Sequence, residues 1–302
     1  MTPRPGTQAP PVVGFSRALY SNWLLYLPAR MLVDAGEGLQ LGLGERLYIP
    51  ERVCLTHGHA DHLLGLPGLV AARRFSKGST EKPLEILYPA GTPEVQVVRD
   101  TVERLWSAVE FPVTWIEARP GDRLAAGRKR TIEAFRSNHG NGSLTLGWAV
   151  VEERSRLRPE FAGRSQSELE GLARGGGRAA LMEPYRHILF AHSGDSMPID
   201  PAVIRGADLL VHDATFLDAG DRKWDIHASS EEAIGVAREA GVRCLVLHHL
   251  SIRYAREGVG DRLRAQAQRA GFRGALWWLD DAACVLVTPG ESGQEGGAGG
   301  SR

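Results

Sequence analysis

Three histidines and one aspartate fall within six positions of the stretch THGHADHLLGLPGL, residues 56–69. The stretch follows the apolar run RVCL, which is typical of a buried strand. His57 and His59 are two positions apart, so in extended backbone their side chains point to the same side. Asp61 and His62 follow where the chain turns toward a helix. Imidazole and carboxylate groups are good ligands for Zn²⁺ and similar ions, so the pattern predicts a metal site at a strand end. A solvated polar turn is the alternative.

Four ligands can begin two metal sites but cannot complete both, so further ligands must come from other segments. The candidates stand beyond strand-like runs, in a glycine-rich turn or before a helix: His139 in SNHGNG, Asp195 in HSGDS, Asp213 in VHDAT, His227 in DIHASSEEA and His249 in LVLHHLSIRY. A rigid sheet holds side chains on the loops beyond its strands, so polar residues there are often functional. Simpler alternatives are a plain turn at His139, a helix cap at Asp195 and the neighbouring His248 in place of His249.

Short apolar runs alternate with longer amphipathic ones between residues 11 and 288, which indicates a layered α/β or α+β domain. Helices are expected at 93–109, 229–241 and 260–271. The second has a Ser229 cap with Glu232 three residues later, and Gly241 at its end. Residues 1–10 and 289–302 are rich in small residues and proline and are expected to be flexible.

The composition excludes some classes of protein. Lysine plus arginine equals aspartate plus glutamate, so no global field attracts nucleic acid or an anionic membrane. No run of about 18 apolar residues is present, so no membrane span is expected, and the first ten residues do not resemble a signal peptide. The three cysteines lie far apart in apolar runs, which favours buried free thiols and a cytoplasmic protein.

Taken together, the motifs resemble ribonuclease Z, a branch of the metallo-β-lactamase fold. The segments LVDAGEGLQ, THGHADHLLGLPGL, NHG, SGDS, VHDATF, HASSEEA and LVLHHLSIRY follow the order seen in that family, over residues 12–288. H-x-H-x-D-H alone marks the wider superfamily, whereas GLPGL behind it and HLSIRY near the end are more specific to this branch. The resemblance implies a four-layer αββα sandwich, here a single domain over residues 11–288, with metal ions at the edge between two sheets.

The resemblance also implies a role for each candidate. His57, His59 and His139 would hold one metal ion, Asp61, His62 and His249 the other, and Asp195 would bridge them. The ions would be divalent, Zn²⁺ before Mn²⁺ or Fe²⁺, since these ligands admit all three. Two such ions about 3.5–4 Å apart lower the pKa of a shared water, whose proton Asp61 could accept. His227 would face the scissile phosphate and stabilise the transition state or protonate the leaving oxygen, with Asp213 fixing its tautomer.

Three features depart from the family pattern. Position 213 is Asp where the family usually has Glu, which shortens the reach toward His227 by one methylene. Segment 152–185 is short and lacks the Gly-Pro-rich signature of the family's tRNA-gripping arm, so a short form without that arm is expected. Neutral net charge leaves phosphate contacts to local basic stretches, at 123–130, at Arg73 with Arg74 and at the arginines from 154 to 158, and a solvated face is the alternative for each.

The leading interpretation is a binuclear metal-dependent phosphodiesterase, an endoribonuclease that removes the 3′ trailer from precursor tRNA and leaves a 3′-hydroxyl. A hydrolase of a small phosphodiester or another ester is the second, and the missing arm is its main support. A catalytically silent binding protein on the same fold is the third, weakened because every expected ligand position is filled. The family tends to form homodimers, and segment 62–75, HLLGLPGLVAARRF, is either an interface helix or one that only packs on the sheet.

Overall fold

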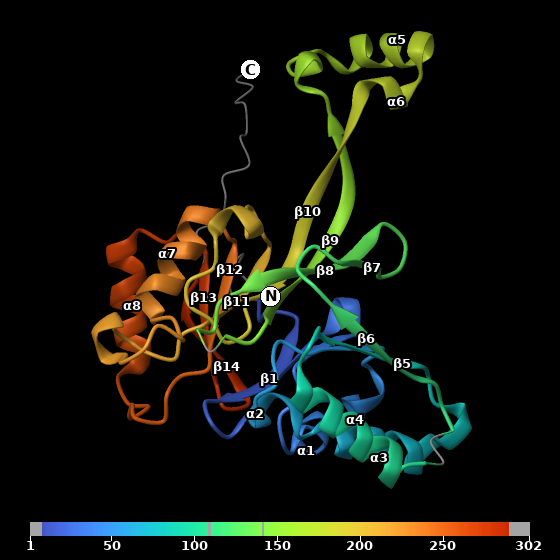
Figure 1. Ribbon diagram of the computed structural model, residues 1–302. Helices are drawn as coiled ribbons and strands as arrows, with labels where there is room; N and C mark the ends of the chain where they lie inside the picture. The colour runs from blue at the N-terminus through green and yellow to red at the C-terminus, as the bar shows by residue number, and fades with distance from the viewer. Residues whose placement is uncertain (1–7, 108–109, 141, 290–302) are drawn as a thin grey trace.

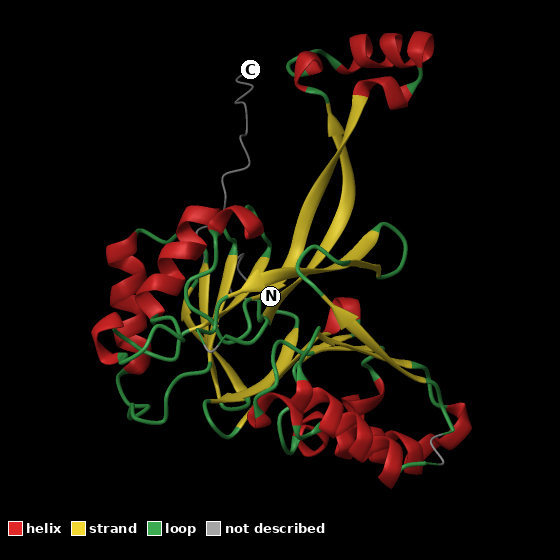
Figure 2. Cartoon of the chain, in the orientation of Figure 1, coloured by secondary structure: helices red, strands yellow, loops and turns green. Residues whose placement is uncertain are grey.

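Two β-sheets pack face to face in the computed structural model, and helices cover the outer face of each (Figure 1, Figure 2). The structure describes residues 8–107, 110–140 and 142–289. The order of layers confirms the αββα sandwich predicted from the sequence. The expected flexible segments lie almost entirely outside the described residues, which begin at 8 and end at 289.

The N-terminal part of the chain forms the first sheet, with six strands in the order β1-β2-β3-β4-β5-β6. The strands β1, β2 and β3 pair antiparallel, and β3 to β6 run parallel to one another. Their bounds are β1 Val12–Arg17, β2 Ser21–Tyr26, β3 Met31–Val33, β4 Arg52–Cys54, β5 Leu84–Pro89 and β6 Val113–Ala118.

The second sheet has eight strands in the order β14-β13-β12-β11-β10-β9-β8-β7. The strands β10 to β13 run parallel, and the pairs on either side of them are antiparallel. Their bounds are β7 Arg123–Ala125, β8 Arg130–Ser137, β9 Thr145–Leu157, β10 Met182–His192, β11 Leu209–Asp213, β12 Cys244–His248, β13 Ala275–Asp280 and β14 Ala283–Thr288.

Helices α1, α3 and α4 cover the first sheet, and α7 and α8 cover the second (Figure 1). The helix bounds are α1 Leu39–Leu43, α2 Ala60–Leu63, α3 Leu66–Lys77, α4 Pro93–Leu105, α5 Gln166–Gly176, α6 Arg178–Leu181, α7 Ser230–Ala240 and α8 Val259–Ala270. The capping box predicted for α7 is present, because Ser229 and Glu232 each bond the other's backbone N–H, and Gly241 ends the helix at φ 68°.

Consecutive apolar residues in the strands follow from burial of both faces of each sheet. In β2, Trp23 and Leu25 pack under the helices, whereas Leu24 and Tyr26 face the second sheet across the central core. The same holds in β12, where Val246 faces the central core. The apolar runs stop where the strands leave the core, so the polar residues that follow them lie at an edge of the sandwich.

A two-stranded ribbon projects from the second sheet and carries α5 and α6 at its tip (Figure 1, Figure 2). It is the outer part of β9 and β10, which pair as far as Leu157 with Met182. We call residues 153–186 the arm. The sequence indicated a short segment here and did not predict this projecting ribbon. Its strands carry charged residues of both signs, and one pair bridges the ribbon, Arg156 Nε with Glu183 Oε1 at 2.7 Å.

Arg73 also differs from expectation. Its guanidinium is fully buried and donates to Glu81 Oε1 at 2.9 Å and to the Pro50 carbonyl at 2.7 Å. A side chain enclosed in this way cannot reach a nucleic-acid phosphate, so the candidate contact at this position is wrong.

Candidate metal centre

The predicted ligands follow strand ends in both sheets. The turn after β4 carries His57 and His59, and α2 carries Asp61 and His62. From the second sheet, Asp195 follows β10, His249 follows β12, and His139 lies between β8 and β9. The structure brings all seven side chains together at one edge of the sandwich.

The first group of side chains is His57, His59 and His139. One ring nitrogen from each lies within 4.8 Å of the others. His139 Nε2 is 3.4 Å from His59 Nδ1, and the ring centroids of His57 and His139 are 4.9 Å apart. Three imidazoles converging in this way present three neutral nitrogen donors to one point, which is a donor set that suits a divalent transition metal.

The second group is Asp61, His62 and His249. Asp61 Oδ2 lies 3.5 Å from His62 Nε2 and 3.8 Å from His249 Nε2. His249, with φ 65°, turns its ring into this group, whereas the ring of His248 lies 4.7 Å from that of His192. Of the two neighbouring histidines, the structure therefore puts His249 beside Asp61.

The carboxylate of Asp195 lies between the two groups. Its Oδ2 is 3.1 Å from His249 Nε2, 3.3 Å from His62 Nε2 and 3.9 Å from His57 Nε2. Gly194 places it there with φ 65°, and a Cβ at Gly194 would meet the Thr56 Cβ at 2.8 Å. A side chain at position 194 would therefore push the loop of Asp195 away from the first sheet.

Hydrogen-bond partners fix the tautomers of four rings, those of His57, His62, His139 and His249. Thr56 donates its hydroxyl proton to Asp34, so it accepts from His57 Nδ1–H at 2.9 Å. Asp34 Oδ2 also accepts from His62 Nδ1–H at 2.8 Å. In each case Nδ1 carries the proton, so the Nε2 lone pair faces the centre of the site.

The same arrangement holds on the second sheet. Thr215 donates to Asp213 Oδ1, so it accepts from His249 Nδ1–H at 2.8 Å, and His139 Nδ1 donates to the Ile226 carbonyl at 2.9 Å. Sequence reasoning missed Thr215 and Asp34. The signal for Asp34 was present, because LVDAG is another apolar run that ends in a carboxylate.

Several atoms directed into the centre are buried without a hydrogen-bond partner among the described residues. These are His57 Nε2, His249 Nε2 and Asp195 Oδ1. Leaving a buried polar atom unpaired costs about 1–3 kcal/mol, so a cluster of three is expected only where another species completes them. Because the atoms are lone-pair donors that face one another, the residues fit a cation rather than an anion.

The electrostatics of the imidazoles point the same way. Burial opposes a positive charge on His62, but the carboxylates of Asp195 and Asp34 outweigh it and raise the pKa of that imidazole well above its usual value. Burial, together with the charge of His62, lowers the pKa of the adjacent His57. The centre thus favours positive charge but disfavours several protonated rings side by side. A divalent cation between neutral imidazoles satisfies both conditions.

His227 and Asp213 form a separate pair beside the two groups. His227 Nδ1 lies 2.6 Å from Asp213 Oδ2, so the shorter aspartate makes the contact in place of a glutamate. Asp213 is fully buried and also accepts from the N–H groups of Ser196 and Thr215. Burial lowers the pKa of His227, but the charge and hydrogen bond of Asp213 outweigh it and raise the pKa to about 9.

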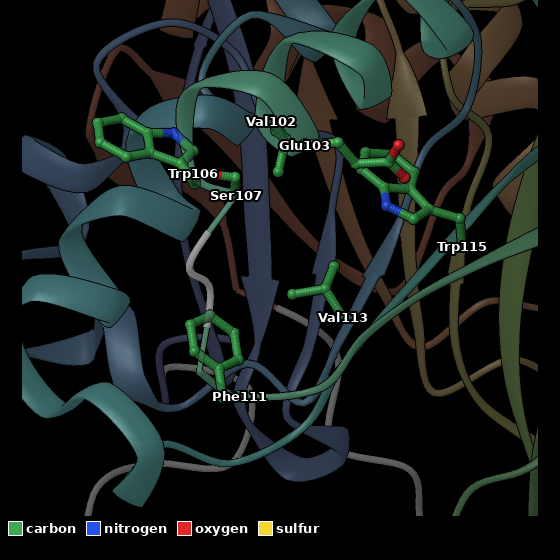
Figure 3. A pocket seen from close by; sticks show the side chains of 7 residues that line it. All are labelled: Val102, Glu103, Trp106, Ser107, Phe111, Val113 and Trp115. Carbon is green, nitrogen blue, oxygen red and sulfur yellow. The ribbon is translucent and has the colours of Figure 1, made fainter.

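A cavity of about 360 Å³ lies elsewhere, beside α4 and β6 (Figure 3). Its lining is largely apolar and consists of Val102, Glu103, Trp106, Ser107, Phe111, Val113 and Trp115. None of the predicted site residues belongs to it. The chemistry of the histidine cluster is therefore independent of this cavity.

Known proteins share this sequence and fold. The profile of the β-lactamase superfamily domain matches residues 29–158. Ribonuclease Z from Halobacterium salinarum is 33% identical over 278 residues, which are 83% of this chain and 85% of that protein. Ribonuclease Z from Gemmatimonas aurantiaca is 34% identical over 251 residues, 75% of this chain and 78% of that protein. The structure of the short form of human tRNase Z aligns with a TM-score of 0.59 at 23% identity, over 80% of this chain and 93% of that one, which shows a shared fold.

Proposed function

Because the chain belongs to the ribonuclease Z family, we propose that it is a metal-dependent endoribonuclease that removes the 3′ trailer from precursor tRNA. The matched relatives are named ribonuclease Z, and the match covers most of their length. The fold is shared with a known tRNase Z. The observation that supports the proposal most directly is the convergence of buried, unpaired nitrogen and oxygen atoms at one edge of the sandwich.

The two groups of ligands suit two divalent ions. His57, His59 and His139 would hold one, Asp61, His62 and His249 the other, and Asp195 would be shared between them. Zn²⁺ suits these nitrogen and oxygen donors best, and Mn²⁺ or Fe²⁺ are compatible with them. When bound, such ions lower the pKa of a water and neutralise charge on the phosphate.

Asp61 is the carboxylate best placed to act on the attacking water. Its side chain is 15% exposed, whereas that of Asp195 is 2% exposed. Burial raises the pKa of Asp61, but the neighbouring imidazoles of His249 and His62 outweigh it and lower the pKa, so the group is ionised at neutral pH. It can therefore orient the water and accept its proton as the water oxygen attacks phosphorus.

His227 is suited to the other end of the reaction. With its pKa raised, it is protonated at neutral pH, and its Nδ1 is held by Asp213, which leaves Nε2 to act. As the bond between phosphorus and the 3′ oxygen breaks, His227 donates a proton to that oxygen. The products are a tRNA with a 3′-hydroxyl and a trailer with a 5′-phosphate.

The arm supports an RNA substrate. A nuclease that acts on a folded RNA needs phosphate contacts outside its metal site, and the arm extends well away from the sandwich (Figure 1). The main reason for preferring a small phosphodiester was the expected loss of the arm. The projecting ribbon formed by residues 153–186 weakens that reason and favours an RNA substrate.

We also propose a homodimer and a cytoplasmic location. The helix α3 buries Leu66 and Leu69 on the first sheet, yet Phe75 at its far end is 68% exposed and Leu64 just before it is 51% exposed. These side chains suit an interface between two copies, which sedimentation equilibrium would detect.

The three cysteines are free thiols, as expected in a reducing compartment. Among the described residues, no helix is long and apolar enough to cross a membrane.

The test compares two substrates, a precursor tRNA transcript and bis-p-nitrophenyl phosphate. The protein is expected to release the trailer, leave a 3′-hydroxyl, lose activity with a chelator and regain it with Zn²⁺. Hydrolysis of the small diester without trailer cleavage would favour the second interpretation. Inactivity on both substrates, with less than one metal ion per chain, would favour the silent binding protein.

A further inference from the structure

Asn22 is a buried polar residue in the apolar strand β2, directly beside the candidate metal centre. Its side chain is 3% exposed. Its Nδ2 lies 2.9 Å from Asp61 Oδ2, and its Oδ1 lies 2.8 Å from Ser16 Oγ. A buried polar side chain lowers stability unless it is hydrogen-bonded. Here both the oxygen and the nitrogen of the Asn22 amide have hydrogen-bond partners.

The hydrogen bonds of Ser16 decide which way the amide points. Ser16 lies opposite Asn22 in the pairing of β1 with β2, and its Oγ accepts the His249 backbone N–H at 2.7 Å. The single hydroxyl proton of Ser16 is then donated to Asn22 Oδ1. The amide nitrogen must therefore face Asp61, where it can donate to the carboxylate.

The backbone holds Asn22 at this distance. The Gly36 N–H donates to the Asn22 carbonyl at 3.0 Å, and the Ala35 N–H donates to the His62 carbonyl at 2.7 Å. A Cβ at Gly36 would lie 2.3 Å from the Asp61 carbonyl oxygen and 2.5 Å from the Asn22 nitrogen. The strand β2 and the turn of Asp61 thus approach as closely as a glycine between them allows.

We propose that Asn22 is a positioning residue for Asp61, an inference that rests on the proposed function. Its amide N–H bonds Oδ2 and fixes the rotation of the carboxylate, so that Oδ2 stays directed toward His62 and His249 and Oδ1 is left for the reacting water. A hydrogen bond to a carboxylate is stronger than one between neutral groups. An amide adds no charge, so it orients Asp61 without competing for the cations.

Ser16 and Asn22 together form a clamp from the first hairpin. Asn22 holds the side chain of Asp61, and Ser16 holds the backbone of His249. These two ligands belong to the same group but come from different sheets. The clamp therefore sets the separation of two ligands that neither sheet alone determines.

The test uses Asn22→Ala and the isosteric Asn22→Asp, with Zn²⁺ affinity measured by chelator competition and kinetics measured on bis-p-nitrophenyl phosphate. Asn22→Ala is expected to weaken the affinity for one Zn²⁺ and to lower kcat, each by about 10- to 100-fold, with KM little changed. Asn22→Asp should be at least as impaired, because a carboxylate cannot donate to Asp61. An Asn22→Asp variant with near wild-type values would show that only the shape of residue 22 matters and would overturn the inference.

A double substitution separates positioning from general stability. Once Asp61→Asn is present, adding Asn22→Ala should change Zn²⁺ affinity little further, whereas two independent effects would multiply and would contradict the inference. Gln266→Ala is the matched control, because Gln266 is also 3% exposed and its amide bonds Ser230 and the Leu217 carbonyl, away from the centre. It should lower the melting temperature but leave Zn²⁺ affinity and kcat unchanged.

Ser16→Ala keeps the inference testable if both Asn22 variants fail to fold. It removes the group that orients the amide, so a several-fold loss of Zn²⁺ affinity and kcat is expected, and wild-type values would overturn the inference. Failure of the proposed function gives a different result. In that case the wild type itself would not release the trailer from precursor tRNA, whatever the Asn22 variants do to Zn²⁺ affinity and diester hydrolysis.

Discussion

The candidate metal centre and the arm are built in opposite ways. At the centre each of four imidazoles is held from behind by a second group, and most of the ligand side chains are buried. In the arm a two-stranded ribbon leaves the sandwich, and an exposed ion pair between Arg156 and Glu183 bridges its two strands. Several independent hydrogen bonds fix the side-chain positions at the centre. The conformation of the arm depends mainly on the pairing of its own two strands.

The difference indicates at which positions the protein should tolerate substitutions without unfolding. A buried hydrogen-bonding group that loses its partner costs about 1–3 kcal/mol, whereas an exposed ion pair contributes about 0–1 kcal/mol. Substitutions at the centre should therefore affect ligand geometry, and substitutions in the arm should affect the RNA substrate while leaving the chemistry intact.

The largest effect is expected from Asp61→Ala. The variant loses the proposed base and a metal ligand, so kcat should fall at least about 10³-fold on both precursor tRNA and bis-p-nitrophenyl phosphate. Circular dichroism should show an unchanged fold, because Asp61 lies in a short helix at the edge of the sandwich. Activity within tenfold of the wild type would contradict the role of Asp61 as base and metal ligand at the centre.

Asp213→Asn is expected to have the next largest effect, visible in the pH dependence. His227 acts as an acid when protonated, so activity should be full below its pKa of about 9 and fall as the pH rises through that value. Without the charge of Asp213 the pKa of His227 drops, so the alkaline limb should move to lower pH.

At pH 8 the rate of Asp213→Asn should fall by about 10²-fold or more. His227→Ala is the matched variant, and it should abolish the limb altogether. An alkaline limb that does not move in Asp213→Asn would contradict the assigned role of this pair.

Deleting the tip of the arm should separate the substrates. Leu157 and Met182 are paired, so residues 158–181 can be replaced by a short glycine–serine turn. The KM for precursor tRNA should rise about 10- to 100-fold, equivalent to about 1.4–2.8 kcal/mol of lost binding. The kcat/KM for bis-p-nitrophenyl phosphate should stay unchanged. An equal loss on both substrates would mean that the arm supports the centre and not only the substrate.

The smallest effect is expected from Arg156→Ala in the arm. Its ion pair with Glu183 is exposed, so the free energy of unfolding should change by no more than about 1 kcal/mol in urea titrations. Glu183→Ala should match it, since both variants break the same pair. A loss of several kcal/mol in either would mean that the ribbon is as strongly determined as the centre.

The sequence predicted the parts of the site that local pattern encodes. The spacing of His57, His59, Asp61 and His62 behind an apolar strand follows from the periodicity of extended backbone. The capping box of α7 was visible for the same reason, because Ser229 and Glu232 are three residues apart. Apolar runs predicted most strands, since both faces of each sheet are buried.

Which residues meet behind the ligands was not visible, because contact between residues distant in sequence leaves no local pattern. His62 meets Asp34 across 28 positions, His249 meets Thr215 across 34, and Asp61 meets Asn22 across 39. The arm was missed for a related reason. A mixture of arginine and glutamate is typical of a solvated loop, and it becomes a ribbon only through the pairing of residues 27 positions apart, Arg156 and Glu183.

By itself, then, the sequence determined which residue types stand at the strand ends and what kind of chemistry they can perform. Only the tertiary structure decided which oxygen and nitrogen atoms face one another, that His249 rather than His248 turns toward Asp61, and that residues 153–186 project as an arm. The physical reason is that side-chain chemistry and backbone periodicity are local properties, whereas the distance between two strand ends is set by the packing of both sheets.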